Sequence, residues 1–291
     1  MKVVGFTIVR NAVRLDYPVV EAIRSILPLC DEIIVAVGNS TDTTLDLVRS
    51  IHSEKIKIIQ TVWDDTQRVG GRALALETDK AYAAIPDDAD WCIYIQADEV
   101  LHEKYHTTVR EAMQKYKDYS EVDGLLFNYL HFYGSYDYVG SSWSWYRREI
   151  RVVRKNDLVF SYRDAQGFRK KPNEKLRVKL IDAYMYHYGW VRDPRAMHRK
   201  HEAFSHFYHD DNWIAENIAA KAEEFDYSQI DALEKFTGTH PQVMEERIKR
   251  LNWKFDHDVS KNKLAFRERL KRIASRMLGW RVGEYRNYRI I

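Results

Sequence analysis

The chain has 291 residues, of which 45% are hydrophobic and 31% charged, so it is long enough to bury a sizeable core and unlike a disordered protein. No apolar run approaches the ~20 residues that cross a bilayer, and residues 1–9 lack the features of a signal peptide, which predicts a cytoplasmic protein. The net charge is +3, but the charge is unevenly distributed along the chain. Residues 261–291 contain ten Lys and Arg residues and only two Glu residues, so the C-terminal end is basic. Cys30 and Cys92 lie in apolar contexts, which predicts buried free thiols.

Apolar runs rich in β-branched residues alternate with helical patterns over the first hundred residues. Residues 2–9 and 31–37 are predicted strands, and residues 17–27 between them carry apolar side chains at helical spacing, which makes a βαβ unit. The alternation continues with a helix around Leu45, Val48 and Ile51, a strand over 56–62, a helix over 73–84 and a strand over 91–97. Parallel strands with helices on their faces follow from this order.

The strand predicted over 91–97 ends in two adjacent carboxylates, Asp98 and Glu99. An ionised carboxylate beside a core is costly to desolvate unless a cation or strong donors meet it, so this pair predicts a metal or ligand site. In parallel sheets ligands collect at the carboxyl ends of the strands, where Asn11 and residues 38–42 also fall. The structural alternative is that Asp98 caps a following helix.

In the second half the pattern changes to long aromatic runs over 124–134, 150–155 and 176–187, which favour mixed or antiparallel sheet. From Asp193 the chain is predicted to be helical, with Pro194 in the first helical turn.

Three polar loops border the predicted strands and helices of the first half, and each has a plain structural alternative. Asn11 offers amides to a base or ribose, or forms a turn. Residues 38–44 place small polar groups before a helix, where they hold a nucleotide or cap the helix. Arg72 follows two glycines and is placed to meet a phosphate. The chain has neither a GxGxxG nor a GxxxxGKS/T motif, which argues against the usual dinucleotide and P-loop sites.

The order of these motifs resembles glycosyltransferase family 2 with the GT-A fold. Residues 7–12 (TIVRNA) resemble that family's opening strand and turn, residues 38–44 (GNSTDTT) its DxGSTDxT loop, and residues 95–99 (IQADE) its LDADE segment. The resemblance covers residues 1–190. It implies an α/β fold with a Rossmann-like, mostly parallel central sheet and flanking helices. The helical pattern from Asp193 onward predicts that a helical C-terminal region follows over 191–291.

By this resemblance the donor is a nucleotide-activated sugar, and Asp98 helps to hold a divalent cation, Mn²⁺ or Mg²⁺, on its diphosphate. His187 lies in a segment that resembles the family's HYGY-like one, and would be a further metal or diphosphate ligand; a histidine packed in an aromatic cluster is the alternative. Val37 stands where the family has an acid that reads the base, and Gln96 replaces the first acid of its DxD motif. The implied donor-binding residues are Thr7, Val9, Arg10, Asn11, Asn39, Arg72, Gln96 and Asp98.

An inverting transfer needs a carboxylate that takes the proton of the attacking hydroxyl. Residues 161–168 match the stretch where the family carries this base, and Asp164 is the nearest acid there, so Asp164 is the predicted base, with a structural pairing to a nearby arginine as the alternative. Glu149 and Asp137 are its rivals, and Glu99 is a second catalytic candidate.

Residues 128–148 are dense in aromatic rings and polar donors. Aromatic faces bury the C–H surface of sugars while Arg, His and Tyr bind hydroxyl or acidic groups, so this run is predicted to bind the acceptor. Alternating aromatics also pack well in a sheet core, which is the alternative. The acceptor-binding candidates are Tyr129, His131, Tyr146, Arg147 and Trp190.

The stretch 261–278 is basic and amphipathic. It is predicted either to make peripheral contact with anionic lipid at the inner face of a membrane, where a lipid-linked acceptor would reside, or to pack on its own domain. Nucleic acid is not an expected partner, because neither a helix-turn-helix nor an RNP signature occurs.

Together these features predict a bacterial-type glycosyltransferase of cell-envelope polysaccharide biosynthesis, which moves a sugar from a nucleotide donor to a glycan or lipid-linked acceptor with inversion. Residues 1–190 are the predicted catalytic domain, and 191–291 a helical region with the basic tail. The alternatives are a sugar nucleotidylyltransferase, which would want a Gly-rich basic loop after the first strand, and a non-catalytic carbohydrate-binding protein, which gives no reason for Asp98 and Glu99 at a strand end.

Overall fold

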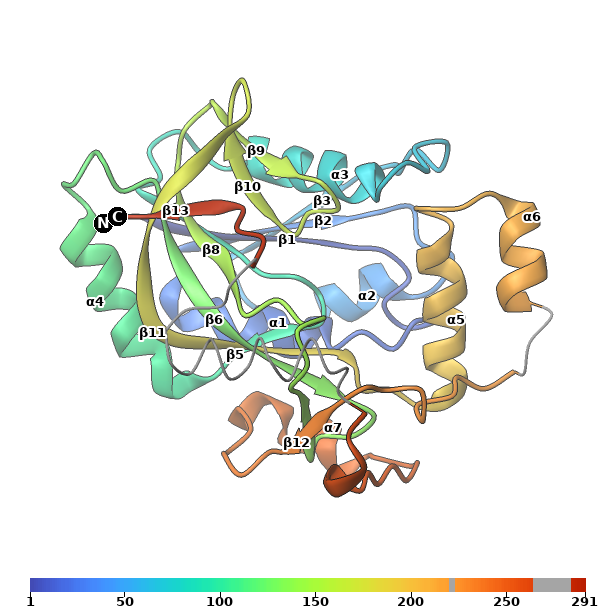
Figure 1. Cartoon of the computed structure of the whole chain (residues 1–291). Coiled ribbons are helices and arrows are strands. Elements are labelled where there is room, and N and C mark those ends of the chain that lie inside the picture. The colour runs from blue at the N-terminus through green and yellow to red at the C-terminus, as the bar shows by residue number, and fades with distance from the viewer. Residues whose placement is uncertain (220–222, 264–283) are drawn as a thin grey trace.

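The computed structural model describes residues 1–219, 223–263 and 284–291 (Figure 1). Most of the basic stretch predicted to contact a membrane falls outside these ranges. Among the described residues no helix is long and apolar enough to span a bilayer.

One curved sheet runs through the molecule, and its first four strands are parallel (Figure 1). They lie in the order β3 (Ile56–Gln60), β2 (Glu32–Val37), β1 (Val3–Val9) and β4 (Trp91–Tyr94). The sheet continues with β8 (Arg148–Arg154), β6 (Gly124–Tyr133), β11 (Glu174–Trp190), β10 (Gly167–Lys170) and β9 (Val159–Tyr162). Strand β8 is antiparallel to β4 and β6, whereas β6 and β11 are parallel. The predicted α/β class is therefore confirmed, but the central sheet is mixed rather than mostly parallel, because β8, β9 and β10 pair antiparallel with their neighbours.

Helices cover both faces of this sheet, and the two faces form separate cores (Figure 1). Side chains alternate along β1, so that Val4, Phe6 and Ile8 pack with α3 (Arg72–Ala83), while Val3 and Val9 belong to the core of the opposite face. That opposite core includes α1 (Val19–Ile26) and α4 (His106–Tyr116), and α2 (Thr44–Arg49) contributes Val48. Burial of each such aliphatic or aromatic side chain stabilises the fold by about 1.5–3 kcal/mol.

Of the described residues after 190, only some are helical. Helix α5 (Pro194–Ser205) begins as predicted, because the Asp193 carboxylate accepts hydrogen bonds from the first backbone N–H groups and Pro194 occupies the first turn. Short helices α6 (Asp211–Ile214) and α7 (Glu245–Lys249) and a π-helix over Ala215–Ala219 follow.

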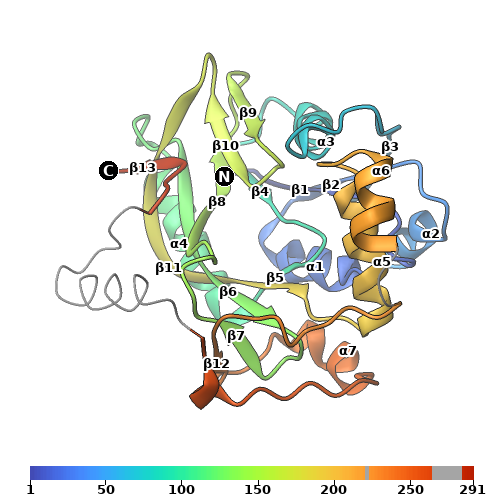
Figure 2. The same ribbon diagram turned by 45° about the vertical axis from the view of Figure 1, so that its right-hand side comes forward.

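Two short strands interrupt this C-terminal region and join the sheet. Strand β12 (Leu233–Lys235) pairs with β7 (Tyr138–Gly140), and β13 (Tyr288–Ile290) lies parallel to β11 (Figure 2). The described part of residues 191–291 is therefore not the uniformly helical region that the sequence pattern predicted, and the division at residue 190 stays a prediction. The remaining elements are β5 (Glu99–Leu101) and 3-10 turns over Leu27–Leu29, Glu103–Tyr105, Gln242–Met244 and Val259–Lys261.

Both cysteines are buried and free, as predicted from their apolar surroundings. Burial raises the pKa of the Cys92 thiol to about 12, which leaves it without thiolate character at neutral pH.

Candidate functional site

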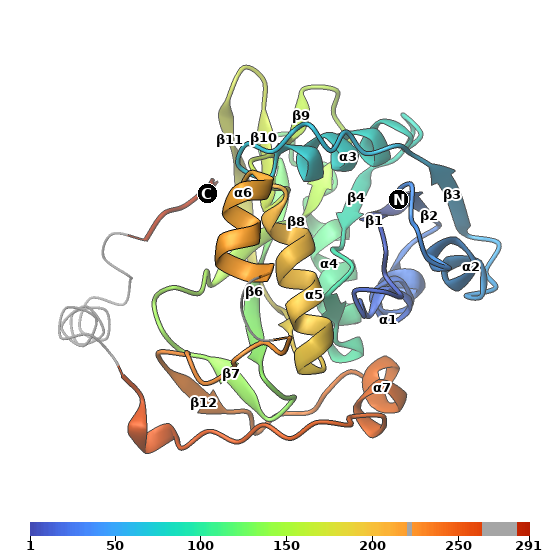
Figure 3. The same cartoon turned by 90° about the vertical axis from the view of Figure 1, so that its right-hand side faces the viewer.

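A cavity of about 490 Å³ opens at the carboxyl ends of β1 and β4. Helix α5 stands beside these strand ends and supplies one wall (Figure 3). The other walls come from residues 8–11 at the end of β1, residues 96–98 after β4, residues 164–166 between β9 and β10, and His187, Gly189 and Trp190 at the end of β11. The carboxyl edge of a parallel sheet is where ligands of α/β proteins bind, so this cavity is the candidate site.

The fold brings most of the predicted site residues to this cavity and leaves the rest away from it. The predicted residues that line it are Val9, Arg10, Asn11, Gln96, Asp98, Tyr146, Asp164, His187 and Trp190. Those that do not are Thr7, Asn39, Arg72, Glu99, Tyr129, His131 and Arg147. Sequence reasoning missed Tyr17, Lys200, His201 and Phe204, which also line it. The sequence of α5 did contain a pattern that could have predicted them, because the spacing of Lys200, His201 and Phe204 places the three side chains on one face of a helix.

Asp98 lies on a turn rather than at a helix start. Strand β4 ends at Tyr94, earlier than predicted, and Glu99 N donates to Gln96 O at 3.0 Å before β5 pairs with β11. A strand follows Asp98 directly, so the helix-cap alternative does not apply. The turn aims the Asp98 carboxylate into the cavity.

Three basic side chains surround the Asp98 carboxylate. Lys200 Nζ donates to Asp98 Oδ2 at 3.0 Å, Arg192 Nη2 lies 3.8 Å from the same oxygen, and His187 Nε2 lies 3.8 Å from Oδ1. Burial raises the pKa of Asp98, but the charges of these neighbours outweigh it and hold the pKa well below its usual value. Burial and the charge of Arg192 lower the pKa of Lys200 to about 8, so at pH 7 Lys200 is predominantly an ammonium.

A chain of hydrogen bonds sets the tautomer of His187. Burial lowers the pKa of His187 to about 4 and that of His131 to about 3, so both rings are neutral at pH 7. His131 Nε2 lies 2.7 Å from the Tyr146 carbonyl oxygen, which only accepts, and must therefore carry the proton. His131 Nδ1 is then the acceptor for His187 Nδ1–H at 3.0 Å. The lone pair of His187 Nε2 is left on the side of Asp98, the arrangement that a cation ligand needs.

Glu99 lies beneath the cavity in the protein core. Both of its oxygens accept from the Arg151 guanidinium at 2.8 Å, and Oε1 also accepts from Tyr129 at 2.7 Å. Glu99 and Arg151 are both 0% exposed. The structure therefore does not bring Glu99 to the cavity, and its contacts are those of a residue that supports the turn carrying Asp98.

Glu149, a rival for the catalytic base, is buried on β8 and does not line the cavity. Its Oε1 accepts from Gln166 Nε2 at 2.7 Å, and its Oε2 has no hydrogen-bond partner among the described residues. Burial raises the pKa of Glu149 to about 8, against the opposing charge of Arg151. Asp137, the other rival, lies outside the cavity as well, on the turn between β6 and β7.

We expect Glu149 to make the protein less stable as the pH rises from about 4.5 to about 8. In that range the folded state holds a proton that the unfolded state has lost, so the free energy of unfolding falls by up to about 1.4 kcal/mol per pH unit. Glu149→Gln should remove this slope, which urea denaturation at several pH values measures. Asp157→Asn, on a carboxylate that is 92% exposed, is the matched control. An unchanged slope in Glu149→Gln would show that Glu149 is ionised in the folded protein.

Asp164 stands on a tight loop whose flanking residues, Arg163 and Ala165, have φ of 58° and 63°. Tyr208, just after α5, donates to Asp164 Oδ2 at 2.8 Å. Gly71 lies so close that a Cβ there would collide with Asp164, and Gly71 N donates to Phe207 O at 3.1 Å. Two segments remote in sequence thus hold Asp164 at the cavity wall.

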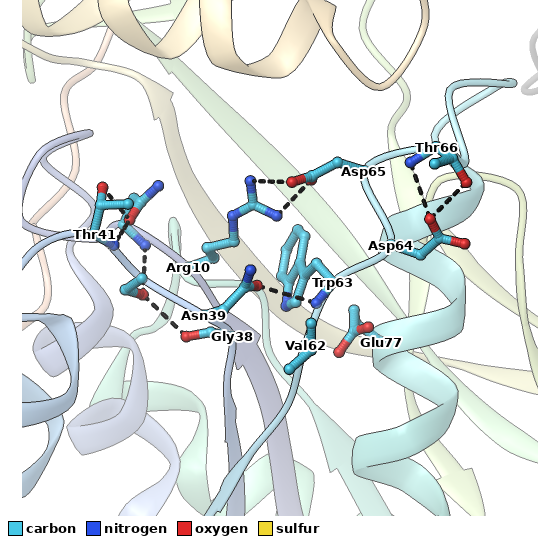
Figure 4. Close-up of polar contacts among 12 residues, drawn as sticks. Arg10, Gly38, Asn39, Thr41, Val62, Trp63, Asp64, Asp65, Thr66 and Glu77 are labelled. Carbon is cyan, nitrogen blue, oxygen red and sulfur yellow. Dashed lines mark hydrogen bonds and ion pairs between the residues drawn. The ribbon is translucent and has the colours of Figure 1, made fainter.

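The polar loops after β1 and β2 are tied to one another (Figure 4). Asn39 Oδ1 accepts from the backbone N of Trp63 at 3.1 Å, and Asn11 Oδ1 accepts from the backbone N of Thr41 at 2.7 Å. Arg10 pairs with Asp65 at 2.7 Å beside the Trp63 ring. The amide oxygens of both asparagines therefore stabilise the loops, as the turn alternative predicted for Asn11, while Asn11 also lines the cavity.

The aromatic run divides between core and cavity. Tyr129 and His131 are buried in the sheet, as the core alternative predicted. Arg147 forms a two-armed ion pair with Glu284 at 2.7 and 2.8 Å. Tyr146 and Trp190 line the cavity and leave aromatic surface there for a ligand.

Comparison with known proteins finds only distant similarities. No family model matches the chain, and no curated protein matches it. Among solved structures, TarS 1–349 from S. aureus aligns at 13% identity and a TM-score of 0.40, covering 70% of this chain and 64% of that fragment. Glucosyl-3-phosphoglycerate synthase from Mycobacterium tuberculosis, solved with Mn²⁺, uridine diphosphate and phosphoglyceric acid, aligns at 18% identity and 0.30, covering 45% and 43%.

A third structure, 4-diphosphocytidyl-2C-methyl-D-erythritol synthase from Anaerococcus prevotii, aligns at 11% identity and a TM-score of 0.36, covering 62% of this chain and 89% of its own. At such identities and scores, the functional interpretation of the site rests on the geometry of this chain.

Proposed function

We propose that the protein is a glycosyltransferase that moves a sugar from a nucleotide donor to an acceptor hydroxyl with inversion. The observation that carries the proposal is the convergence of Asp98, His187 and Asp164 with the end of β1 on one cavity. This arrangement provides separate places for a diphosphate and for a proton acceptor, as such a transfer requires.

The donor diphosphate is proposed to bind at Asp98. Asp98 Oδ1 and the free lone pair of His187 Nε2, 3.8 Å apart, fit two ligands of a divalent cation. No group of three or more His, Cys, Asp or Glu residues in the described ranges could hold a metal ion, so phosphate oxygens and water would complete the coordination. A bound cation would neutralise charge on the departing nucleoside diphosphate.

Asp164 is proposed to act as the base. As the acceptor oxygen forms its bond to the anomeric carbon, the bond from that carbon to the diphosphate oxygen breaks, and the hydroxyl proton passes to the Asp164 carboxylate. Tyr208 occupies Oδ2, which leaves Oδ1 for the proton. The acceptor is proposed to be a glycan or lipid-linked glycan, because Tyr146 and Trp190 offer ring surface in the same cavity.

We expect a nucleoside diphosphate with Mn²⁺ to raise the melting temperature. A ligand at 100 times its Kd stabilises the folded state by about 2.7 kcal/mol. A thermal-shift panel of UDP, GDP, dTDP and CMP compounds would identify the base, and the absence of any shift would contradict the proposed function.

Asp98→Asn should reduce the nucleotide shift in Mn²⁺ but not in EDTA, because the carboxylate is proposed to act through the cation. Each shift is measured against the ligand-free melting temperature of the same variant. Asp46→Asn, on an exposed carboxylate of α2, is the control. An undiminished shift in Mn²⁺ would remove Asp98 from the metal site.

A further inference from the structure

Two cations beside Asp98 have no part in the chemistry proposed so far: Lys200, which lines the cavity, and Arg192, which lies behind it. Lys200 lies on the face of α5 that also presents Met197, His201 and Phe204 to the cavity. Arg192 lies just before the helix and is 0% exposed. Both make cation–π contacts with the Tyr17 ring, with Lys200 Nζ at 5.2 Å and Arg192 Cζ at 4.7 Å from its centroid.

The Lys200 ammonium has one donor left for a ligand. It donates to Asp98 Oδ2 at 3.0 Å and to Gly189 O at 2.8 Å, and these are its two hydrogen bonds within the described part of the chain. An ammonium group has three N–H donors. Because Lys200 lines the cavity, the third N–H is available to a ligand bound there.

Arg192 adds a positive charge that the surrounding groups do not fully satisfy. Its Nε donates to Leu15 O at 2.9 Å, and Nη1 donates to Gly189 O. Its Nη2 is buried with no hydrogen-bond partner among the described residues, 3.8 Å from Asp98 Oδ2. A buried guanidinium in this state is stabilised by any further negative charge that enters the cavity.

The charges beside Asp98 do not cancel. Lys200 and Arg192 carry two positive charges, and the carboxylate that they both approach, Asp98, carries a single negative charge. A partly buried site with surplus positive charge and an available N–H binds an anion, since low dielectric strengthens the attraction. Asp98 therefore orients the Lys200 ammonium without using all of its N–H donors.

We propose that Lys200, supported by Arg192, binds the donor's diphosphate directly, in addition to any contact made through a cation at Asp98. This inference rests on the proposed function, since it concerns the nucleotide of the same site. It assigns to α5 the role of the helix that holds the leaving group.

The test is isothermal titration of the full chain with the nucleoside diphosphate that gives the largest thermal shift, and with the matching nucleoside. Lys200→Met removes the charge while keeping the length of the side chain, and should weaken diphosphate binding about tenfold or more, as expected for a lost charge-assisted hydrogen bond. Nucleoside binding should be unchanged. The loss should appear in EDTA as well as in Mn²⁺, and Lys200→Arg should restore most of the affinity.

Lys249→Met is the matched control, because Lys249 is exposed and its partner is Glu246. Ligand-free melting of each variant verifies folding, and Lys200→Gln, which keeps a donor without the charge, replaces Lys200→Met if the latter unfolds. Diphosphate binding by a folded neutral variant as tight as that of the natural chain would overturn the role of Lys200 and leave the proposed function standing. Failure of the natural chain to bind any nucleotide would overturn the proposed function itself.

Discussion

Glu99→Gln is expected to lower the free energy of unfolding by about 3–5 kcal/mol, because it leaves the buried Arg151 guanidinium without a counter-charge. The substitution keeps the volume of the side chain and an acceptor for Tyr129, so the loss of charge is the main change. A loss of this size is a large part of the stability of an ordinary domain.

Urea denaturation followed by circular dichroism would measure the effect of Glu99→Gln. Glu246→Gln, on a carboxylate that is 70% exposed, should change stability by less than about 0.5 kcal/mol. The double variant Glu99→Gln/Arg151→Met should be less destabilised than Glu99→Gln, because it no longer buries an unpaired charge. A single variant as stable as the natural chain would show that Arg151 finds another counter-charge or water.

Asp164→Asn is expected to lower the rate of sugar transfer by about 10²–10⁴, because the amide cannot take the hydroxyl proton. Nucleotide binding should be unchanged, since the groups proposed to hold the diphosphate lie at Asp98. Asn keeps the size of the side chain and its contact with Tyr208. The two readouts separate the chemical step from donor binding.

Single-turnover assays with the donor chosen by thermal shift would measure the Asp164→Asn rate, and titration calorimetry the nucleotide affinity. Tyr208→Phe is an informative companion, because it removes the hydrogen bond that positions Asp164 and should slow transfer less than Asp164→Asn. Asp137→Asn, on an exposed rival carboxylate outside the cavity, should retain full activity. An active Asp164→Asn enzyme would assign the base to another group.

Local patterns in the sequence were enough to predict the α/β class and the edge of the sheet where the candidate cavity lies. Alternation of apolar side chains determined the two faces of β1, and the helical spacing over 17–27 and 73–84 located α1 and α3 within two residues at each end. Asp193 and Pro194 predicted the start of α5 because capping depends on residues next to each other in the chain. For the same reason, the local sequence pattern predicted that Asn11 and Asp98 follow the ends of β1 and β4.

The roles of individual side chains at that edge depended on packing between distant segments. Asp98 and Glu99 are neighbours in sequence, yet one lines the cavity and the other is fully buried, because the chain turns at Asp98 and starts a new strand at Glu99. Lys200 meets Asp98 across 102 residues. Burial and charge pairing are properties of the assembled fold, so the sequence by itself determined where acids leave the sheet, and only the tertiary structure decided which of them meet a basic side chain, the cavity or the core.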